Sequence, residues 1–260
     1  MKVRTRFAPS PTGFLHIGGL RTALYNYLFS KQHNGEFILR IEDTDQSRLV
    51  EKSKEQLINI LKKFKLDFDE GPNHNEKLGP YIQSQRLEIY NTYYKKLLEK
   101  NDAYICIQDQ DGNLLPEKDY LKAKEKIKNS KYVVKLKIPK NEEITINDYI
   151  RGEIKFDLSL IEDPIIIKSD GFPTYHFANV IDDHLMNISH VIRGDEWLPS
   201  LPKHIILYKC FEWKPPIFIH LPLLLNADKS KLSKRQGDVH VEDFLKKGYL
   251  KKAIINYVAM

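Results

Sequence analysis

The hydrophobic positions of the first forty residues follow two different repeats. Val3–Ala8 is a short run rich in strand-forming residues, and a Ser-Pro-Thr-Gly sequence interrupts it. From Leu20 to Leu28, apolar side chains recur at the spacing of an α-helix, with Gly35 as a stop just beyond. Phe37–Ile41 is apolar apart from one arginine, which is typical of a buried strand. Strand, helix and strand in this order predict a β–α–β unit with parallel strands.

Later segments extend this pattern and also interrupt it. Helical spacing returns in residues 51–65, 84–100, 199–210 and 250–259, and strand-like runs occupy 132–138, 144–146, 164–168, 190–192 and 217–225. Residues 103–185 combine short strands and turns with one charged helix near 117–129, which indicates an inserted module. In the last helix, the spacing places Ile254, Tyr257 and Val258 on one face. The chain is therefore expected to be an α/β protein whose parallel sheet is split by an α+β insertion.

Composition narrows the class without naming a function. The 260 residues are 42% hydrophobic, enough for a substantial core in one or two domains. No run of about 18 apolar residues occurs, so no membrane span is predicted, and the start of the chain resembles neither a signal nor a transit peptide. Cys106 and Cys210 are too few and too far apart for a disulfide framework. The net charge of +6 suits a polyanionic partner, although a high lysine content alone also produces it.

A loop from Pro9 to Gly19 lies between the first strand and the first helix. Its prolines and glycines fix a tight path, and Gly18 and Gly19 allow a ligand to approach the backbone. The N-terminus of the following helix offers unpaired N–H groups and a partial positive charge, both of which suit phosphate. His16 could donate to a phosphate oxygen as charge develops there. An ordinary turn with an incidental histidine is the competing interpretation.

A basic loop, Lys229–Arg235, lies near the other end of the chain. Most such runs are solvated surface. The functional interpretation is that Lys231 and Lys234 meet a triphosphate, because lysine is a compact charge on a flexible stem.

Together the two loops resemble a known family. His16-Ile17-Gly18-Gly19 is similar to the HIGH signature of class I aminoacyl-tRNA synthetases, and Lys231–Arg235 is similar to their KMSKS loop. The strings between them resemble bacterial-type glutamyl-tRNA synthetase, over about residues 3–259 and most weakly at 107–131. These strings are Arg40–Asp45, Gln83–Arg86, Ser169–His176, Val180–His184 and Val191–Trp197.

The resemblance implies a fold and a division into domains. It implies a Rossmann-type catalytic domain in two halves, 1–102 and 186–245, around an inserted acceptor-binding module at 103–185. Residues 246–260 would begin a helical stem-contact region. Members of the family continue into anticodon-binding domains that these residues do not include, so a truncated catalytic portion is expected.

The resemblance also implies a glutamate site. Arg6 and Arg193 match positions that hold the carboxylates of glutamate, which suits the forked guanidinium. Ser10 and Glu42 match residues around the amino group, and Tyr175 and Asn179 match residues that line the same pocket. Other roles stay open: Arg193 as a surface ion-pair partner, Glu42 as a helix cap, and Tyr175 as plain core.

For ATP, the resemblance implies contacts from His16, Gly18, Gly19, Trp197 and Lys234, with His16, Lys231 and Lys234 as catalytic residues. The implied reaction joins glutamate to AMP with loss of pyrophosphate, Mg²⁺ being bound with the nucleotide. The acyl group then passes to the 3′ end of tRNA(Glu), and AMP is released.

Two further features bear on metal and RNA. Some members of the family carry a zinc site early in the insertion, but only Cys106 is present here, so no zinc and no other protein-bound metal are expected. Residues 117–140 hold nine lysines against three acidic residues, which indicates either contact with acceptor-stem phosphates or a solvated helix face.

Two rival functions stay open. A glutamyl-queuosine tRNA(Asp) synthetase also lacks the anticodon domains, and a non-catalytic paralogue would bind tRNA or nucleotide without reaction. The intact motifs favour the synthetase, which the resemblance leads us to expect as a cytoplasmic monomer.

Overall fold

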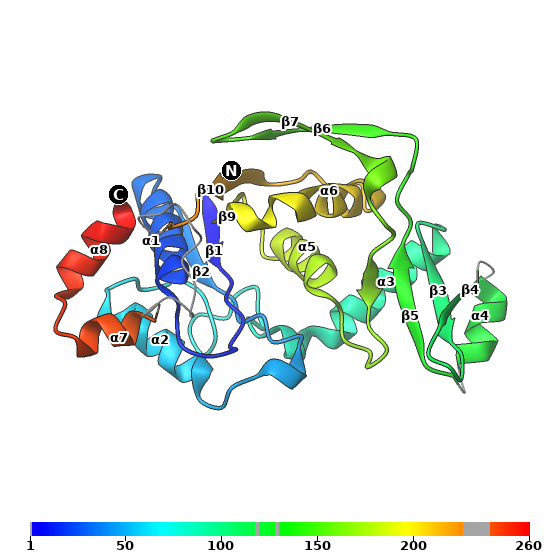
Figure 1. Cartoon of the computed structure of the whole chain (residues 1–260), viewed down its shortest axis with the longest axis horizontal. Helices are drawn as coiled ribbons and strands as arrows, with labels where there is room; N and C mark the ends of the chain where they lie inside the picture. Colours follow the sequence, from blue (N-terminus) through cyan, green and yellow to red (C-terminus); the bar gives the residue numbers. More distant parts are fainter. Residues whose placement is uncertain (1, 118–119, 128–129, 226–239) are drawn as a thin grey trace.

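The computed structural model describes residues 2–117, 120–127, 130–225 and 240–260. Figure 1 shows an elongated molecule with two parallel strand pairs at one end and an antiparallel sheet at the other. In the first pair, β1 (Arg4–Phe7) lies parallel to β2 (Glu36–Leu39), and in the second, β9 (His190–Gly194) lies parallel to β10 (Ile217–Leu221). The backbone N–H of Ser189 donates to the carbonyl of Arg4 at 3.0 Å, so β9 begins beside β1 although 185 residues separate them. The predicted parallel, Rossmann-type sheet is confirmed.

Helix α1 (Ile17–Gln32) connects β1 to β2 and packs on both strands. Leu20, Ala23 and Leu24 are buried, as the helical spacing predicts, whereas Leu28 of the same series is half exposed. The chain turns back after the helix at Gly35, whose N–H donates to Ser30 O at 2.7 Å. A Cβ on Gly35 would lie 2.3 Å from the carbonyl oxygen of Val3, so only glycine lets the chain pass this close to the start of β1.

The segment between the two parallel pairs is antiparallel. One sheet has the order β4-β3-β5-β8, and a separate hairpin pairs β6 with β7. Their bounds are β3 (Ala103–Gln108), β4 (Leu114–Glu117), β5 (Tyr132–Leu136), β6 (Glu143–Asp148), β7 (Gly152–Asp157) and β8 (Ile165–Ile167), with α4 (Tyr120–Lys126) between β4 and β5. The predicted α+β character of this region is confirmed, while the boundaries of the predicted domains stay a prediction.

The remaining helices cover the strands and join the two ends. They are α2 (Ser53–Lys63), α3 (Leu87–Glu99), α5 (Tyr175–Leu185), α6 (Leu201–Cys210), α7 (Val241–Lys246) and α8 (Lys251–Ala259). Short 3₁₀ turns occur at Gln46–Arg48, Gln83–Arg86, Leu158–Leu160 and Asp195–Ser200. In the middle of the molecule, α5 packs against α6 and α3 (Figure 1). The largest buried cluster runs through this junction from the inserted sheet to β9 and β10.

The hydrophobic pattern located most elements but missed one important helix. Every helix predicted from periodicity is present, whereas α5, α7 and the strands β3, β4 and β7 were not predicted. Residues 177–183 of α5 are all buried, including Asn179, Asp182 and Asp183, so polar and charged side chains stand among its buried positions. In α8, Ile254 and Val258 are buried as predicted, but Tyr257 is half exposed because its side of the helix faces solvent. Within the described ranges, no helix is long and apolar enough to cross a membrane.

Candidate functional site

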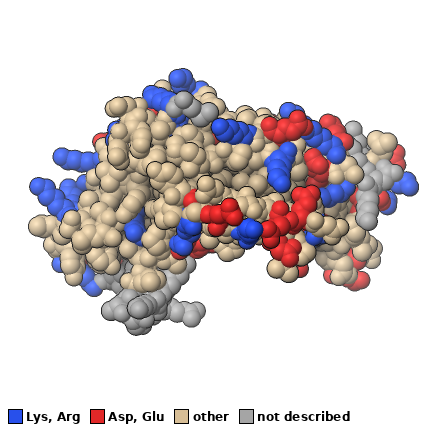
Figure 2. All heavy atoms as spheres, turned by 90° about the horizontal axis from the view of Figure 1, so that it is seen from above, with Lys and Arg blue, Asp and Glu red and all other residues tan. Residues whose placement is uncertain are grey.

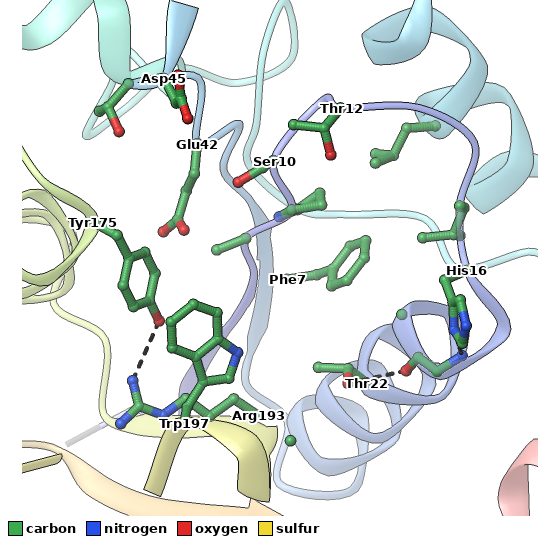
Figure 3. Close-up of a pocket in the computed structure, with 18 of the residues that line it drawn as sticks. Phe7, Ser10, Thr12, His16, Thr22, Glu42, Asp45, Tyr175, Arg193 and Trp197 are labelled. Carbon is green, nitrogen blue, oxygen red and sulfur yellow. Dashed lines mark hydrogen bonds between the residues drawn. The ribbon is translucent and has the colours of Figure 1, made fainter. Parts of the chain in front are cut away.

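A cavity of about 700 Å³ opens beyond the carboxyl ends of β1, β2 and β9, beside the N-terminus of α1. It is lined by nine of the predicted site residues: Arg6, Ser10, His16, Gly18, Gly19, Glu42, Tyr175, Arg193 and Trp197. Asn179 is buried behind the wall and donates its Nδ2 to the hydroxyl of Tyr175 at 3.1 Å. Lys231 and Lys234 lie outside the described residues. In Figure 3, Glu42, Tyr175 and Arg193 occupy one side of the pocket and His16 the other, with Phe7 between them.

Arg6 and Glu42 belong to a buried network of alternating charges. Arg6 donates to Asp183 through Nε at 3.0 Å and Nη2 at 3.2 Å. Arg40, which is fully buried, donates to Asp183 at 2.7 Å and to Glu42 at 2.9 Å. Burial would raise the pKa of Asp183, but the two guanidinium groups lower it below its ordinary value. Asp183 is therefore an anion that fixes Arg6 and Arg40 together.

Burial raises the pKa of Glu42, although Arg40 opposes the shift. A cation in the cavity would oppose it further and favour the carboxylate. Glu42 is thus a buried acid paired with Arg40, which makes the helix-cap interpretation wrong.

A further buried carboxylate, Asp182, connects α5 to α3 and to the 3₁₀ turn before it. It accepts from Gln83 Nε2 at 2.8 Å, Arg86 Nε at 2.7 Å and the hydroxyl of Tyr90 at 2.8 Å. This cluster lies behind the cavity wall and fixes the helix that presents Tyr175 and Asp183.

Arg193 approaches the cavity from the end of β9 and is 4% exposed, so the surface ion-pair interpretation is wrong. Its Nη1 lies 3.3 Å from the hydroxyl of Tyr175 and 3.2 Å from His204 Nδ1, and its Nε donates to His220 Nε2 at 3.0 Å. Nη2 is buried without a hydrogen-bond partner among the described residues. The ring of Tyr175 lies 4.3 Å from that of Trp197, centroid to centroid. Tyr175 is therefore part of the wall as well as of the core.

The two histidines that face Arg193 are neutral. Since a guanidinium only donates, His204 Nδ1 and His220 Nε2 must both accept. His204 can then donate its Nε2–H to His176 Nδ1, 3.1 Å away, and His220 its Nδ1–H to Asp148, 2.7 Å away. Burial, and then the charge of Arg193, lowers the pKa of His220 to about 4. The same two causes lower the pKa of His204 well below its ordinary value.

At the opposite side of the cavity, His16 caps helix α1. Its Nδ1 accepts from the N–H of Gly18 at 3.0 Å, so the neutral ring carries its proton on Nε2. A Cβ on Gly18 would lie 3.3 Å from this Nδ1, and one on Gly19 would lie 2.8 Å from Leu15 Cδ1. The two glycines therefore make room for the loop's own side chains at the start of the helix.

A smaller cavity of about 300 Å³ adjoins the first. The residues that it shares with the larger cavity are His16, Gly18, Gly19, Thr22, Gly194 and Glu196. Arg21 and residues 221–224, at the end of β10 and beyond it, complete its wall. The N-terminus of α1 therefore faces two connected spaces.

Several residues of the site carried no signal in the sequence analysis. Arg40 and Asp183 stand inside strings used for the resemblance, but only the fold pairs them. His220 and Asp148 were not predicted as site residues. A signal for Asp148 exists in the sequence, because this carboxylate continues the alternating series of Ile144 and Ile146 on the buried face of β6. No group of three His, Cys, Asp or Glu side chains able to hold a metal ion occurs in the described part of the chain. Cys106 and Cys210 are free cysteines, and the absence of zinc stays a prediction.

Comparison with known proteins matches this chain to one family. The family model for "tRNA synthetases class I (E and Q), catalytic domain" matches residues 2–118 and 113–260. The chain is 51% identical over 286 aligned positions to a glutamate–tRNA ligase of Chlorobaculum parvum and 52% identical over 284 positions to that of Chlorobium luteolum. Each alignment includes all of this chain and 56% of the relative, so the chain spans just over half the length of these proteins.

Solved structures agree. A glutamate tRNA ligase from Elizabethkingia meningosepticum, in complex with its amino acid, superposes with a TM-score of 0.93 at 39% identity. The superposition covers 100% of this chain and 61% of that one. A putative arginyl-tRNA synthetase from Campylobacter jejuni, at 12% identity and a TM-score of 0.55, shares the fold alone.

Proposed function

This chain belongs to the class I tRNA synthetases for glutamate and glutamine, within their catalytic domain, and from that premise we propose that it activates L-glutamate with ATP. The glutamyl group then passes to the 3′ end of tRNA(Glu). The curated relatives at about half sequence identity, which carry the name glutamate–tRNA ligase, support the choice of glutamate.

The observation that carries the proposal is the presence of Arg6, Glu42 and Arg193 in one cavity. Two guanidinium groups can bind the two carboxylates of glutamate, and one carboxylate can bind its ammonium group. Ser10 lies at the same end of the cavity as a further polar contact (Figure 3). Tyr175, supported by Asn179, forms the wall between Glu42 and Arg193. A neutral amide facing a buried guanidinium leaves an imperfectly paired charge, which favours glutamate over glutamine.

The other end of the cavity suits the triphosphate of ATP. The first turn of α1 presents N–H groups and the positive end of the helix dipole. His16, with its proton on Nε2, is placed to donate to a phosphate oxygen, and Gly18 and Gly19 expose backbone there. Trp197 lies between this end and Tyr175 as a flat surface for the nucleotide.

The proposed chemistry has two steps. An oxygen of the substrate α-carboxylate attacks the α-phosphorus, and the bond to the bridging oxygen breaks to release pyrophosphate. A ribose hydroxyl of the terminal nucleotide then attacks the mixed anhydride, and AMP leaves. Mg²⁺ would enter with the nucleotide and offset phosphate charge. The protein needs no covalent intermediate, because it orients the reactants and stabilises developing charge.

Lys231 and Lys234 are proposed to complete the triphosphate site. The support is their position in the KMSKS-like string, since they lie outside the described residues. Replacement of Lys234 by Ala should lower the rate of activation and leave the dissociation constant for glutamate unchanged.

Contact with the acceptor stem of tRNA is assigned to the lysine-rich segment 117–140. Some of its charges are already compensated: Lys126 pairs with Glu117 at 2.6 Å, and Lys140 lies 3.6 Å from Asp163. Figure 2 likewise shows acidic side chains among basic ones at this end of the molecule. The lysines on and beside β5, namely Lys131, Lys135 and Lys137, are the better candidates.

Glutamine at Lys131, Lys135 and Lys137 should weaken tRNA binding and flatten its dependence on salt concentration, by a slope of about 0.9 for each lost phosphate contact. Unchanged affinity and slope would contradict the assignment.

The domain division proposed for this chain is the one that the family resemblance implies. It consists of a catalytic domain of 1–102 and 186–245, an insertion of 103–185 and a helical region beginning at 246. A cytoplasmic monomer is proposed for the protein that contains them. Sedimentation equilibrium at several concentrations tests the oligomeric state.

ATP–pyrophosphate exchange with glutamate tests the central proposal. Exchange that requires tRNA(Glu) is the result we expect of this family. Exchange without tRNA would favour the glutamyl-queuosine enzyme instead. Absence of exchange under both conditions, in a protein that is folded and includes the full natural chain, would favour a non-catalytic paralogue.

A further inference from the structure

Strand β6 carries a buried carboxylate where its pattern calls for an apolar side chain. Ile144, Ile146 and Asp148 alternate with exposed residues, and Asp148 is only 1% exposed. A buried carboxylate must be compensated by hydrogen bonds. Its Oδ1 accepts from the backbone N–H groups of Ile150 and Arg151, each at 3.0 Å. Its Oδ2 accepts from His220, through the ring Nδ1 at 2.7 Å and the backbone N–H at 3.2 Å.

These bonds decide which nitrogen of His220 carries the proton. Asp148 only accepts, so the proton lies on Nδ1, and the lone pair of Nε2 faces Nε of Arg193 at 3.0 Å. The other ring nitrogen is thereby kept as an acceptor for the guanidinium. Asp148, on the hairpin of the inserted region, thus acts on Arg193 through a neutral histidine on β10.

This relay, which runs from Asp148 through His220 to Arg193, determines where the remaining N–H groups of Arg193 point. Nε is held by His220, and Nη1 is held by Tyr175 and His204. Nη2 is buried and has no partner in the described part of the chain, and Arg193 lines the large cavity. A guanidinium already held at Nε and Nη1 loses less freedom when a carboxylate binds at Nη2.

We propose that Asp148 and His220 are positioning residues that hold Arg193 in the orientation in which it binds a carboxylate of the amino-acid substrate. The inference rests on the proposed function and adds a contribution of the β6–β7 hairpin to the amino-acid pocket. A purely structural role for Asp148 would lower stability without changing the affinity of the folded protein for glutamate.

The first test is Asp148→Asn in the full natural chain. The asparagine oxygen must keep the two backbone N–H groups of Ile150 and Arg151, so its amide N–H₂ faces His220. The ring must then place its proton on Nε2, opposite the N–H of Arg193, and two donors face each other. The KM for glutamate in tRNA-dependent ATP–pyrophosphate exchange should rise about tenfold or more, because a hydrogen bond to a charged group is lost. The KM for ATP and kcat should stay within about twofold of wild type, well below that tenfold step.

Asp163→Asn is the matched control. Asp163 is a carboxylate of the same inserted region and accepts from the N–H of Ile138 at 3.0 Å and the hydroxyl of Tyr104 at 3.1 Å. It is remote from Arg193 in the hydrogen-bond network, so its replacement should change the melting temperature without changing the KM for glutamate.

A second pair of variants tests the acceptor at position 220. His220→Gln keeps one acceptor and one donor on a planar group, whereas His220→Phe keeps only the flat ring. The glutamine variant should therefore retain a KM for glutamate closer to wild type than the phenylalanine variant does.

The outcomes separate the two proposals. Suppose that wild type supports exchange with glutamate, and that Asp148→Asn and His220→Phe fold and have a KM for glutamate within about twofold of wild type. That change is smaller than a lost hydrogen bond should cause, so the positioning role is overturned and the proposed function stands. If wild type neither binds glutamate nor supports exchange, both are overturned.

Discussion

Asp183 accepts two N–H groups from one edge of Arg6, with Nε 3.0 Å from Oδ1 and Nη2 3.2 Å from Oδ2, although 177 residues separate the two residues. Arg6 stands on the first strand, and Asp183 stands on a helix of the central layer. Arg40 donates to the same carboxylate at 2.7 Å and also donates to Glu42. One anion thus sets the positions of the arginine proposed for a substrate carboxylate and, through Arg40, of the carboxylate proposed for the substrate ammonium.

Replacement of Asp183 by Asn should strongly destabilise the fold. It leaves two buried guanidinium groups short of one negative charge, which costs on the order of 3–5 kcal/mol in the free energy of unfolding. Urea denaturation measures this loss. The control is Glu212→Gln, which removes the exposed partner of Lys100 and should change the free energy of unfolding far less, because water screens this pair. Equal effects of the two substitutions would contradict a central role for Asp183.

Replacement of Arg193 by Lys should impair glutamate binding more than ATP binding. An ammonium group cannot hold His220, Tyr175 and a substrate carboxylate at once, as a planar fork does. We expect the dissociation constant for glutamate to rise at least about tenfold. The ratio of the affinities for glutamate and glutamine should fall. Titration calorimetry with each amino acid measures both. An unchanged ratio of the two affinities would remove Arg193 from the specificity site.

Replacement of His16 by Ala should slow activation and spare amino-acid binding. The imidazole caps α1 and is proposed to donate to phosphate as charge develops, so kcat for exchange should fall about a hundredfold or more. His33→Ala, at the exposed far end of the same helix, is the control for loss of an α1 histidine. A comparable loss of kcat in both variants would show that the effect comes from helix stability.

Acid should destabilise the protein through the three buried histidines of the Arg193 network, His176, His204 and His220. Burial and neighbouring cations lower the pKa of His176 and His220 from 6.5 to about 4, and that of His204 well below 6.5. Between these values the unfolded chain binds the protons and the folded chain does not. Their contribution is therefore complete above about pH 6.5 and is lost as the pH falls towards 4, by up to about 1.4 kcal/mol per pH unit for each group.

Urea denaturation at pH 7 and pH 5 checks this, with His176→Gln as the comparison. The variant lacks one of the three titrating groups, so its loss of stability between the two pH values should be smaller. An equal loss would assign the acid sensitivity to other residues.

The sequence alone was sufficient for the periodic elements and for the two ends of the cavity. The spacing from Leu20 to Leu28 predicted α1 because Leu20, Ala23 and Leu24 recur on one side of the helix and are buried there. The glycines and prolines before it predicted the turn that brings His16 to its N-terminus, because backbone geometry there is a local property. The resemblance, which rests on the sequence alone, predicted that Arg6, Glu42, Tyr175 and Arg193 belong to the site.

Tertiary structure decided how these groups are held. Helix α5 was not predicted because its buried face includes Asp182 and Asp183, whose charges are tolerated only where Arg6, Arg40 and Arg86 come from other elements. Asp148 and His220 lie 72 residues apart in the sequence, and they form a hydrogen bond only because the fold places β6 against β10. Hydrophobic periodicity records which face of an element is buried, and that is a local property of the chain. The partner of a buried charge is a long-range property, because low-dielectric burial makes each such charge depend on whichever segment the fold places against it.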